Sequence, residues 1–146
     1  MIHPFDDNYF MKKALQEAEI ALAEGEVPIG AVVVCNHQII AKGHNQVETL
    51  NDATAHAEML AITAATNYLG SKYLKDCTLY ITLEPCQMCA GAIFWSQIGH
   101  IVYGASDEKR GYQHLNCQVH PKTQVKAGVM ASESEALLQQ FFSKMR

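Results

Sequence analysis

Apolar side chains recur every three or four residues near both ends of the chain, the spacing that places them on one face of a helix. The range from Asn8 to Ala23 shows this spacing and is followed by Gly25, so an amphipathic helix is predicted there. Ser132 can cap a last helix with the apolar residues Leu137, Leu138, Phe141, Phe142 and Met145. Their spacing alone predicts that at least one of Phe141 and Phe142 packs in the core.

Short runs of β-branched and aromatic residues predict strands between these two helices. Ala31 to Cys35 and Gln38 to Ala41 flank an Asn-His turn and are expected to form a hairpin. Leu79 to Leu83 is expected to be a central strand, because its residues are mostly apolar, β-branched or aromatic. Another strand is expected within Ile98 to Gly104, and a short one from Val125 to Met130.

Two further helices are expected inside the chain. One runs from about Ala55 to Asn67, with Asp52 or Thr54 as its cap and His56 in its first turn. The other runs from Cys86 to Trp95 and follows a proline that ends the preceding strand. The order helix, hairpin, helix, strand, helix, strand predicts an α/β sheet with helices on both faces.

The length and composition are those of one compact domain. With 146 residues, 49% of them hydrophobic, the chain can bury one substantial core, so a single domain over residues 1–146 is expected. It lacks an apolar run of about 18 residues, and residues 1–10 mix acids with aromatics where a signal peptide would be basic and then apolar. A cytoplasmic protein that does not enter a membrane is predicted.

The net charge argues against general binding of polyanions. It is −4 at pH 7, whereas proteins that collect phosphate groups usually present a basic face. A local basic surface is still compatible with the sequence, because cations gather in the last part of the chain: Lys109, Arg110, Lys122, Lys126, Lys144 and Arg146.

The number and spacing of the cysteines favour a metal site. Five cysteines do not suit a disulfide framework, and two of them, Cys86 and Cys89, form a C-x-x-C pair. With His56 they supply one nitrogen and two sulfur ligands. Three such ligands without a fourth are typical of a catalytic zinc, whose remaining position holds water or substrate. The other thiols are interpreted as having no chemical role: Cys35, Cys77 and Cys117.

The expected helix starts add to the zinc hypothesis. Cys86 and Cys89 lie one turn apart at the start of a helix, where the helix dipole favours the thiolate. His56 and Glu58 diverge along a helix, so both can approach one metal only over its N-terminal end. Glu58 can then carry protons from a zinc-bound water to the substrate and the departing amine. Because zinc makes hydroxide available near neutral pH, a hydrolase that displaces an amine is predicted.

The polar segment from Gly43 to Asp52 leads directly to His56 and is expected to be a loop that carries substrate contacts. Asn45 is the main candidate within it. Its residue type alone favours an amide satisfied inside the loop, and a contact to substrate is the alternative.

Three stretches resemble the zinc-dependent cytidine and adenosine deaminase superfamily, and most closely the bacterial tRNA-specific adenosine deaminases. They are Glu26 to Val34, Thr54 to Glu58 and Leu83 to Ala92, and the last two carry the H-x-E and P-C-x-x-C signature of zinc deaminases. The resemblance runs from about Tyr9 to Asp107 and resumes at Phe141-Phe142.

This resemblance implies a three-layer α/β/α sandwich with a mixed five-stranded sheet, of the cytidine deaminase type. It also implies a homodimer with one Zn²⁺ per subunit. The implied reaction is the hydrolytic conversion of adenosine to inosine at the wobble position of a tRNA anticodon loop, attacked by zinc-bound hydroxide.

For single residues, the resemblance implies that His56, Cys86 and Cys89 bind zinc and that Glu58 carries protons. It further implies a group of substrate-binding residues: Asn45, Ala57, Asp107 and Phe142. Among them, Asn45 would hydrogen-bond the flipped base and Asp107 would touch neighbouring nucleotides. An aromatic of the last helix, Phe141 or Phe142, would line the nucleotide pocket instead of the core.

Two other functions are compatible with the same motifs. Deaminases of free guanine, cytosine or cytidine share them, and a non-catalytic zinc or redox module could use Cys86 and Cys89. The chain departs from the family between Asp107 and Val125, where it is shorter, and at Phe94-Trp95-Ser96, where it is bulkier. In the family, these regions shape the RNA surface or the dimer.

Overall fold

The computed structural model describes residues 5–144, which form five strands and four helices. The strands are β1 (Gly30–Cys35), β2 (Gln38–His44), β3 (Cys77–Leu83), β4 (His100–Ala105) and β5 (Gln124–Lys126). The helices are α1 (Asp7–Ala23), α2 (Ala57–Leu69), α3 (Gln87–Ser96) and α4 (Ala131–Ser143). Met145, which the apolar spacing assigned to the last helix, lies outside the described residues. No helix within residues 5–144 is both long and apolar enough to cross a bilayer.

The strands form one mixed sheet in the order β2-β1-β3-β4-β5, with β3 in the middle as predicted. β1 is antiparallel to β2 and to β3. β4 runs parallel to β3, and β5 runs parallel to β4. Parallel neighbours cannot be joined by a tight turn, and α3 supplies the crossover between β3 and β4.

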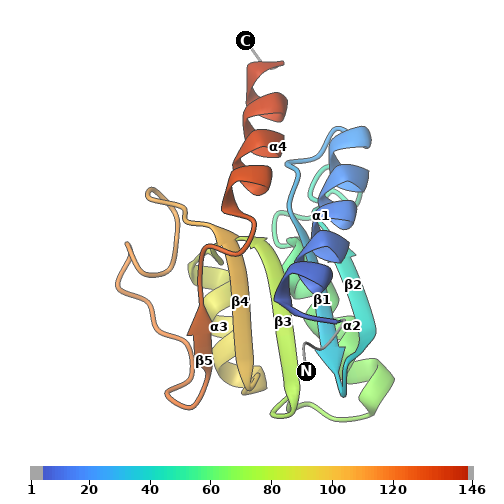
Figure 1. Ribbon diagram of the computed structural model, residues 1–146, viewed down its shortest axis with the longest axis vertical. Helices are drawn as coiled ribbons and strands as arrows, with labels where there is room; N and C mark the ends of the chain where they lie inside the picture. The colour runs from blue at the N-terminus through green and yellow to red at the C-terminus, as the bar shows by residue number, and fades with distance from the viewer. Residues whose placement is uncertain (1–4, 145–146) are drawn as a thin grey trace.

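Helices cover both faces of the sheet, which confirms the expected three layers (Figure 1). One face carries α1 and α4, and the other carries α2 and α3. Between the sheet and the α2–α3 layer lies the larger apolar cluster, which includes Ile81 and Ile93. The smaller cluster, with Met11 and Tyr80, lies under α1. Neighbouring residues of β3 thus contribute to opposite layers, as the period of a strand requires.

The hairpin between β1 and β2 turns at Asn36 and His37, whose φ angles are 52° and 63°. Two residues with positive φ make the mirror-image turn that matches the twist of paired strands. The hairpin is therefore confirmed, but β2 is longer than predicted, because pairing continues to Gly30 opposite His44. The loop toward the second helix begins after His44 rather than at Gly43.

Several element bounds differ from the sequence prediction: α3 is Gln87–Ser96 instead of Cys86 to Trp95, and two other helix starts and one strand end also differ. The second helix begins at Ala57, with extended His56 as its N-cap, while Asp52 accepts a hydrogen bond from the Thr54 N–H at 2.8 Å instead of capping the helix. The last helix begins after Met130 rather than Ser132. The short fifth strand stops at Lys126, and the chain then turns through a glycine at position 128 with a φ of 88°.

Helix α4 stands above the end of the sheet, with the C-terminus at its tip (Figure 1). Within the described residues, Ser134 is its one buried side chain, and its hydroxyl donates to the Thr82 carbonyl at 2.5 Å. Phe142 is 52% exposed and Phe141 is half-buried. The prediction that helical spacing places one of these rings in the core was wrong, because the second half of α4 extends past the sheet that would cover it.

Asp7, at the start of α1, ties this helix to the sheet. Its two carboxylate oxygens accept hydrogen bonds from the Tyr80 hydroxyl and from Lys126 Nζ, both at 2.7 Å. The contacts join α1, β3 and β5. This carboxylate therefore has a structural role on the face of the sheet that α1 covers.

Candidate zinc centre

The start of α2 is held directly against β2. Gly43 makes this possible, because a Cβ atom there would lie 2.4 Å from the Ala57 carbonyl oxygen and 2.9 Å from the Ala61 nitrogen. His56 is the N-cap of α2 and has an extended backbone. Its imidazole therefore points from the N-terminal end of the helix rather than from its side, as the expected metal position requires.

The other two ligands come from the start of α3. β3 ends just before Pro85, and Cys86 is the N-cap of α3 with a ψ of 177°. Cys89 follows one turn later and is fully buried. Two helix N-termini therefore face the same point, where their partial positive charges favour thiolate ligands.

The three side chains fit a zinc ion. Nδ1 of His56 lies 3.6 Å from the sulfur of Cys86 and 3.6 Å from that of Cys89. All three ligand atoms lie within 4.8 Å of one another. Tetrahedral zinc, with bonds of about 2.3 Å to sulfur and about 2.0 Å to nitrogen, separates these two atom types by about 3.5 Å, close to the distances observed. The predicted ligands are therefore brought together at the right separation.

Neighbouring groups prepare one of the thiols for metal binding. Hydrogen bonding with Cys89, together with His56, lowers the pKa of Cys86 to about 4, so this side chain is a thiolate at neutral pH. The hydrogen bond with Cys86, together with burial, raises the pKa of Cys89 above its usual range. His56 also hydrogen-bonds the backbone of Ala53, the kind of contact that orients a metal-binding imidazole.

Glu58 lies beside the ligands, near the start of α2, and is only 4% exposed. Its carboxyl group contacts Cys89 and its own backbone N–H. Burial, reinforced by the charge of Cys86, raises the pKa of Glu58 to about 7. A carboxyl group with this pKa can both accept and donate a proton near neutral pH, as a proton carrier must.

Asn45 lies where β2 gives way to the loop and is 6% exposed. Its Oδ1 accepts a hydrogen bond from the backbone N–H of Ala57 at 2.8 Å. Ala57 itself is completely buried. One end of the Asn45 amide is thus fixed to the first residue of α2, next to the zinc ligand His56.

Glu26 holds the loop that connects Asn45 to His56. This carboxylate is 2% exposed and accepts hydrogen bonds from the Glu48 N–H at 3.1 Å and from the Thr49 N–H and hydroxyl, both at 2.7 Å. Burial acts to raise the pKa of Glu26, but these donors outweigh it and the pKa lies below the ordinary value. The sequence indicated Glu26 only as part of a motif.

Asp107 begins the turn that follows β4. Its Oδ1 accepts hydrogen bonds from the backbone N–H groups of Lys109 at 3.1 Å and Arg110 at 3.0 Å, so the side chain caps its own turn. The turn is in contact with Glu84, immediately before Pro85. Glu84 was not predicted as a functional residue, although a carboxylate between an apolar strand and a proline was the available signal.

Phe142 lies in different surroundings from the other predicted substrate-binding residues. It contacts Phe141, with 5.2 Å between the ring centroids. It also lines a shallow groove whose other lining residues all belong to α4: Glu135, Leu138, Gln139 and Ser143.

Residues 5–105 match the family model for the cytidine and deoxycytidylate deaminase zinc-binding region. The matched range includes the zinc-ligand candidates and Glu58. A tRNA-specific adenosine deaminase from Streptococcus pyogenes serotype M18 is 43% identical to this chain over 147 residues. The alignment covers 97% of this chain and 92% of that relative.

Two solved structures have similar folds. One, from a study of A-to-I editing by tRNA:A34 deaminases at the wobble position of transfer RNA, has 42% identity and a TM-score of 0.81. It matches 89% of this chain and 99% of its own. A guanine deaminase from Bacillus subtilis has 40% identity and a TM-score of 0.66, over 80% of this chain and 69% of its own.

Proposed function

The chain belongs to the family of the cytidine and deoxycytidylate deaminase zinc-binding region, and from this premise we propose that it converts adenosine to inosine at the wobble position of a tRNA anticodon. The observation that carries the chemistry is the buried Glu58 beside His56, Cys86 and Cys89. The choice of tRNA is supported by the 43% identity, over nearly the whole chain, to a tRNA-specific adenosine deaminase.

The reaction consumes water and releases ammonia, so protons must move at two places. His56, Cys86 and Cys89 would hold the zinc ion, which would lower the pKa of a coordinated water to about 7 and so make a hydroxide nucleophile available. Glu58 accepts a proton from the attacking water and delivers it to a ring nitrogen of adenine. It then takes the second proton of that water from the new C–OH group and passes it to the departing amine, so the ring carbon keeps the oxygen as a carbonyl and ammonia leaves. One carboxyl serves both steps because its pKa is about 7.

Asn45 holds the base in this proposal. Since Oδ1 is occupied by the Ala57 N–H, the Nδ2 amino group is the end left to donate to a ring acceptor of the purine. Ala57 acts through Asn45 by fixing its orientation. A wobble base is unpaired, which makes its extrusion into a buried pocket less costly than flipping from a duplex.

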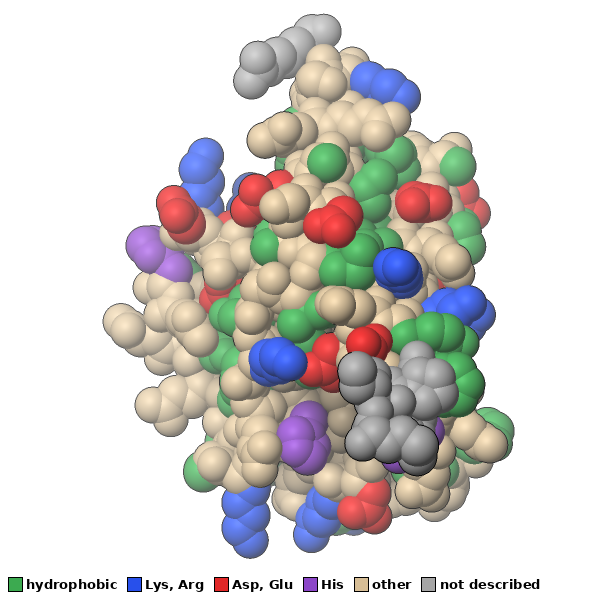
Figure 2. All heavy atoms as spheres, viewed as in Figure 1, with side chains coloured by type: hydrophobic (Ala, Val, Ile, Leu, Met, Phe, Trp, Pro, Cys, Tyr) green, Lys and Arg blue, Asp and Glu red, His purple; other side chains and the backbone are tan. Residues whose placement is uncertain are grey.

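The remaining substrate-binding residues contact flanking nucleotides. Asp107 does so from the turn after β4, and Phe142 offers an exposed ring for stacking, which contributes about 1–3 kcal/mol per base. Acidic and basic side chains are interspersed on the face carrying α1 and α4 (Figure 2). Phosphate contacts on this face must therefore be local.

We further propose that two copies of the chain form the homodimer through the α2–α3 face. Trp95 is 76% exposed and Tyr73 is 41% exposed, and both line a groove between α2 and α3 with Ile62 and Ala92. Exposed apolar surface of this kind marks interaction sites. A two-fold pairing would cover the same patch on both copies.

A substrate panel tests the proposed function. The zinc-loaded protein is incubated with an anticodon stem-loop that carries adenosine at the wobble position, and separately with guanine, cytosine, cytidine and adenosine. Inosine in the RNA and an equal amount of ammonia are expected. A stem-loop with guanosine at that position is the matched control. Release of ammonia from guanine or cytosine alone would favour a free-base deaminase, which the similarity to a guanine deaminase makes the main rival.

A further inference from the structure

We propose that Glu84 is a positioning residue that fixes the turn formed by residues 107–113 to the start of α3, and so sets the position of Asp107 relative to the zinc ligands. The inference rests on the proposed function, because it assigns that turn to the binding of flanking nucleotides. Glu84 itself contacts neither metal nor substrate in this role.

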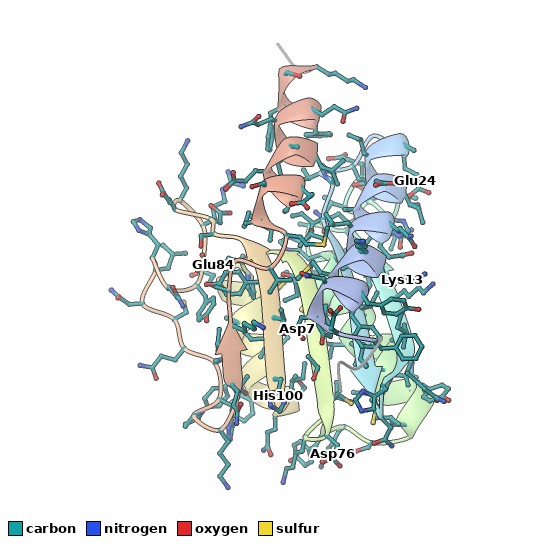
Figure 3. The ribbon with its side chains drawn as sticks, in the orientation of Figure 1. Asp7, Lys13, Glu24, Asp76, Glu84 and His100 are labelled. Atoms are coloured by element: carbon teal, nitrogen blue, oxygen red, sulfur yellow. The ribbon has the colours of Figure 1, made fainter. Side chains whose placement is uncertain are left out.

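Both oxygens of the Glu84 carboxylate bind the turn. Oε1 accepts from the Asp107 N–H at 3.0 Å, and Oε2 accepts from the Gln113 N–H at 3.2 Å. The two donors are the first and last residues of the turn, so one side chain holds both of its ends. Glu84 is only 5% exposed, and hydrogen bonds of a buried carboxylate are stronger than those of an exposed one. Figure 3 shows Glu84 at the upper end of the sheet, beside the segment that follows β4.

Backbone contacts fix the same turn to the next two residues of the zinc segment. The Tyr112 N–H donates to the Pro85 carbonyl at 2.9 Å, and Gly111 forms an isolated antiparallel bridge with Cys86. Residues 84–86 therefore all contact the turn, and the last of them is a zinc ligand. Tyr112 adds an apolar anchor, because its ring is 4% exposed within the core under α2 and α3.

Gly111 leaves the space that the Glu84 carboxylate occupies. A Cβ atom at Gly111 would lie 2.4 Å from both Cδ and Oε2 of Glu84, and 2.4 Å from the Asp107 carbonyl oxygen. The carboxylate thus occupies the space that any side chain at position 111 would need. Two substitutions on opposite sides of one contact can therefore disturb the same turn.

Loss of this contact is expected to affect substrate binding more than turnover. His56, Cys86 and Cys89 are carried by the first turns of α2 and α3, and each turn is closed by its own hydrogen bond, from Leu60 N–H to the His56 carbonyl at 3.1 Å and from Ala90 N–H to the Cys86 carbonyl at 2.8 Å. Asp107 and Arg110, in contrast, are carried by it. A shift of the turn misplaces contacts to flanking nucleotides while the reacting groups keep their geometry.

The test compares Glu84→Gln with Gly111→Ala and with the double variant on the wobble-adenosine stem-loop. In Glu84→Gln, an amide NH₂ faces one of the two N–H donors and that hydrogen bond is lost. We expect KM to rise about 10-fold, kcat to stay within about two-fold of wild type, and zinc to stay at one ion per chain. Gly111→Ala should show the same pattern, and the double variant should be no worse than the more severe single variant.

Asp7→Asn is the matched control, because it removes a carboxylate with two hydrogen bonds on the α1 face, away from Glu84 (Figure 3). It should lower stability and leave KM unchanged. A wild-type KM in both folded single variants would overturn the inference, as would loss of zinc together with kcat. If Glu84→Gln does not fold, Gly111→Ala decides by the same criteria. Wild-type protein that is inactive on the stem-loop would instead overturn the proposed function.

Discussion

At the scale of single residues, buried glutamates in this protein differ in what surrounds their carboxyl groups. Glu58 lies near thiolate sulfur with few donors, and burial raises its pKa to about 7. Glu26 is equally buried, but three hydrogen-bond donors lower its pKa. The first environment suits proton transfer and the second suits the fixing of a loop.

Replacing Glu58 by glutamine should reduce turnover by about 10²–10⁴-fold, because the amide cannot accept the proton of the attacking water. Zinc content, measured by mass spectrometry of the metal, should stay at one ion per chain, since Glu58 is not one of the proposed ligands. Ammonia release from the stem-loop measures turnover. If the variant kept wild-type turnover, Glu58 would not be the proton carrier.

Replacing Glu26 by glutamine should lower the free energy of unfolding by about 1–3 kcal/mol at pH 7. The folded-state pKa of Glu26 lies below its ordinary value, so its stabilising effect is complete above that value, near 4.5, and is lost as pH falls through the folded-state pKa. The difference between variant and wild type should therefore shrink below about pH 4.5. Urea unfolding at several pH values measures it.

Glu19→Gln is the control for this experiment, because Glu19 is an exposed residue of α1. Its difference from wild type should be small at every pH. A Glu26→Gln effect that stayed constant down to low pH would show that packing, not charge, provides the stabilisation.

At the scale of elements, the site depends on how closely α2 approaches β2. Gly43 allows the contact, since a Cβ atom there would overlap the first turn of the helix. That first turn carries Glu58 and also the Ala57 N–H group that donates to Asn45. The spacing of two elements thus determines the positions of three residues with proposed roles: the metal ligand His56, the proton carrier Glu58 and the base-binding Asn45.

Gly43→Ala is expected to destabilise the protein by about 1–3 kcal/mol, because the added methyl group must push α2 away from β2. Zinc affinity, measured by competition with a chelator, should fall as His56 moves. Gly91→Ala is the matched control in α3, where nothing lies within 4 Å of the new Cβ. It should be neutral or stabilise by up to about 1 kcal/mol, since alanine favours a helix over glycine. Equal effects at the two positions would contradict the packing explanation.

At the scale of the whole molecule, the two helical layers expose different kinds of side chain. The α1 face carries mixed charges (Figure 2), whereas the α2–α3 face exposes Trp95 and Tyr73. The zinc ligands belong to the α2–α3 layer. A second copy bound to that face would therefore contact the same layer that carries the zinc ligands. The proposed dimer would then form next to the elements that hold the proposed active site.

Trp95→Glu should convert the proposed dimer to a monomer of 16.2 kDa, because a charge cannot be buried without a partner in an apolar contact. Light scattering coupled to gel filtration measures the mass. Ile20→Glu changes an exposed apolar residue of α1, which is 43% exposed on the opposite face, and should leave the dimer intact. A wild-type protein that is monomeric at micromolar concentration would reject the dimer proposal.

The sequence by itself determined the elements whose cause is local. Apolar spacing predicted α1, and β-branched runs predicted the hairpin and the central strand, because side-chain period and turn chemistry act over a few residues. The residue types of His56, Cys86 and Cys89 also indicated zinc before any geometry was known, since one nitrogen and two sulfur ligands suit few other ions.

Only the tertiary structure decided which residues support these groups. Helix α2 starts at Ala57 rather than at about Ala55, because contact with β2 and the hydrogen bond to Asn45 fix its first turn there. Phe142 is exposed because its helix extends past the sheet, which no helical spacing can reveal. The role of Glu84 depends on the N–H donors of residues 107 and 113, which only the fold brings to its carboxylate. These hydrogen bonds join positions 12 to 29 residues apart, and pairing over that distance depends on the whole packed chain rather than on local preference.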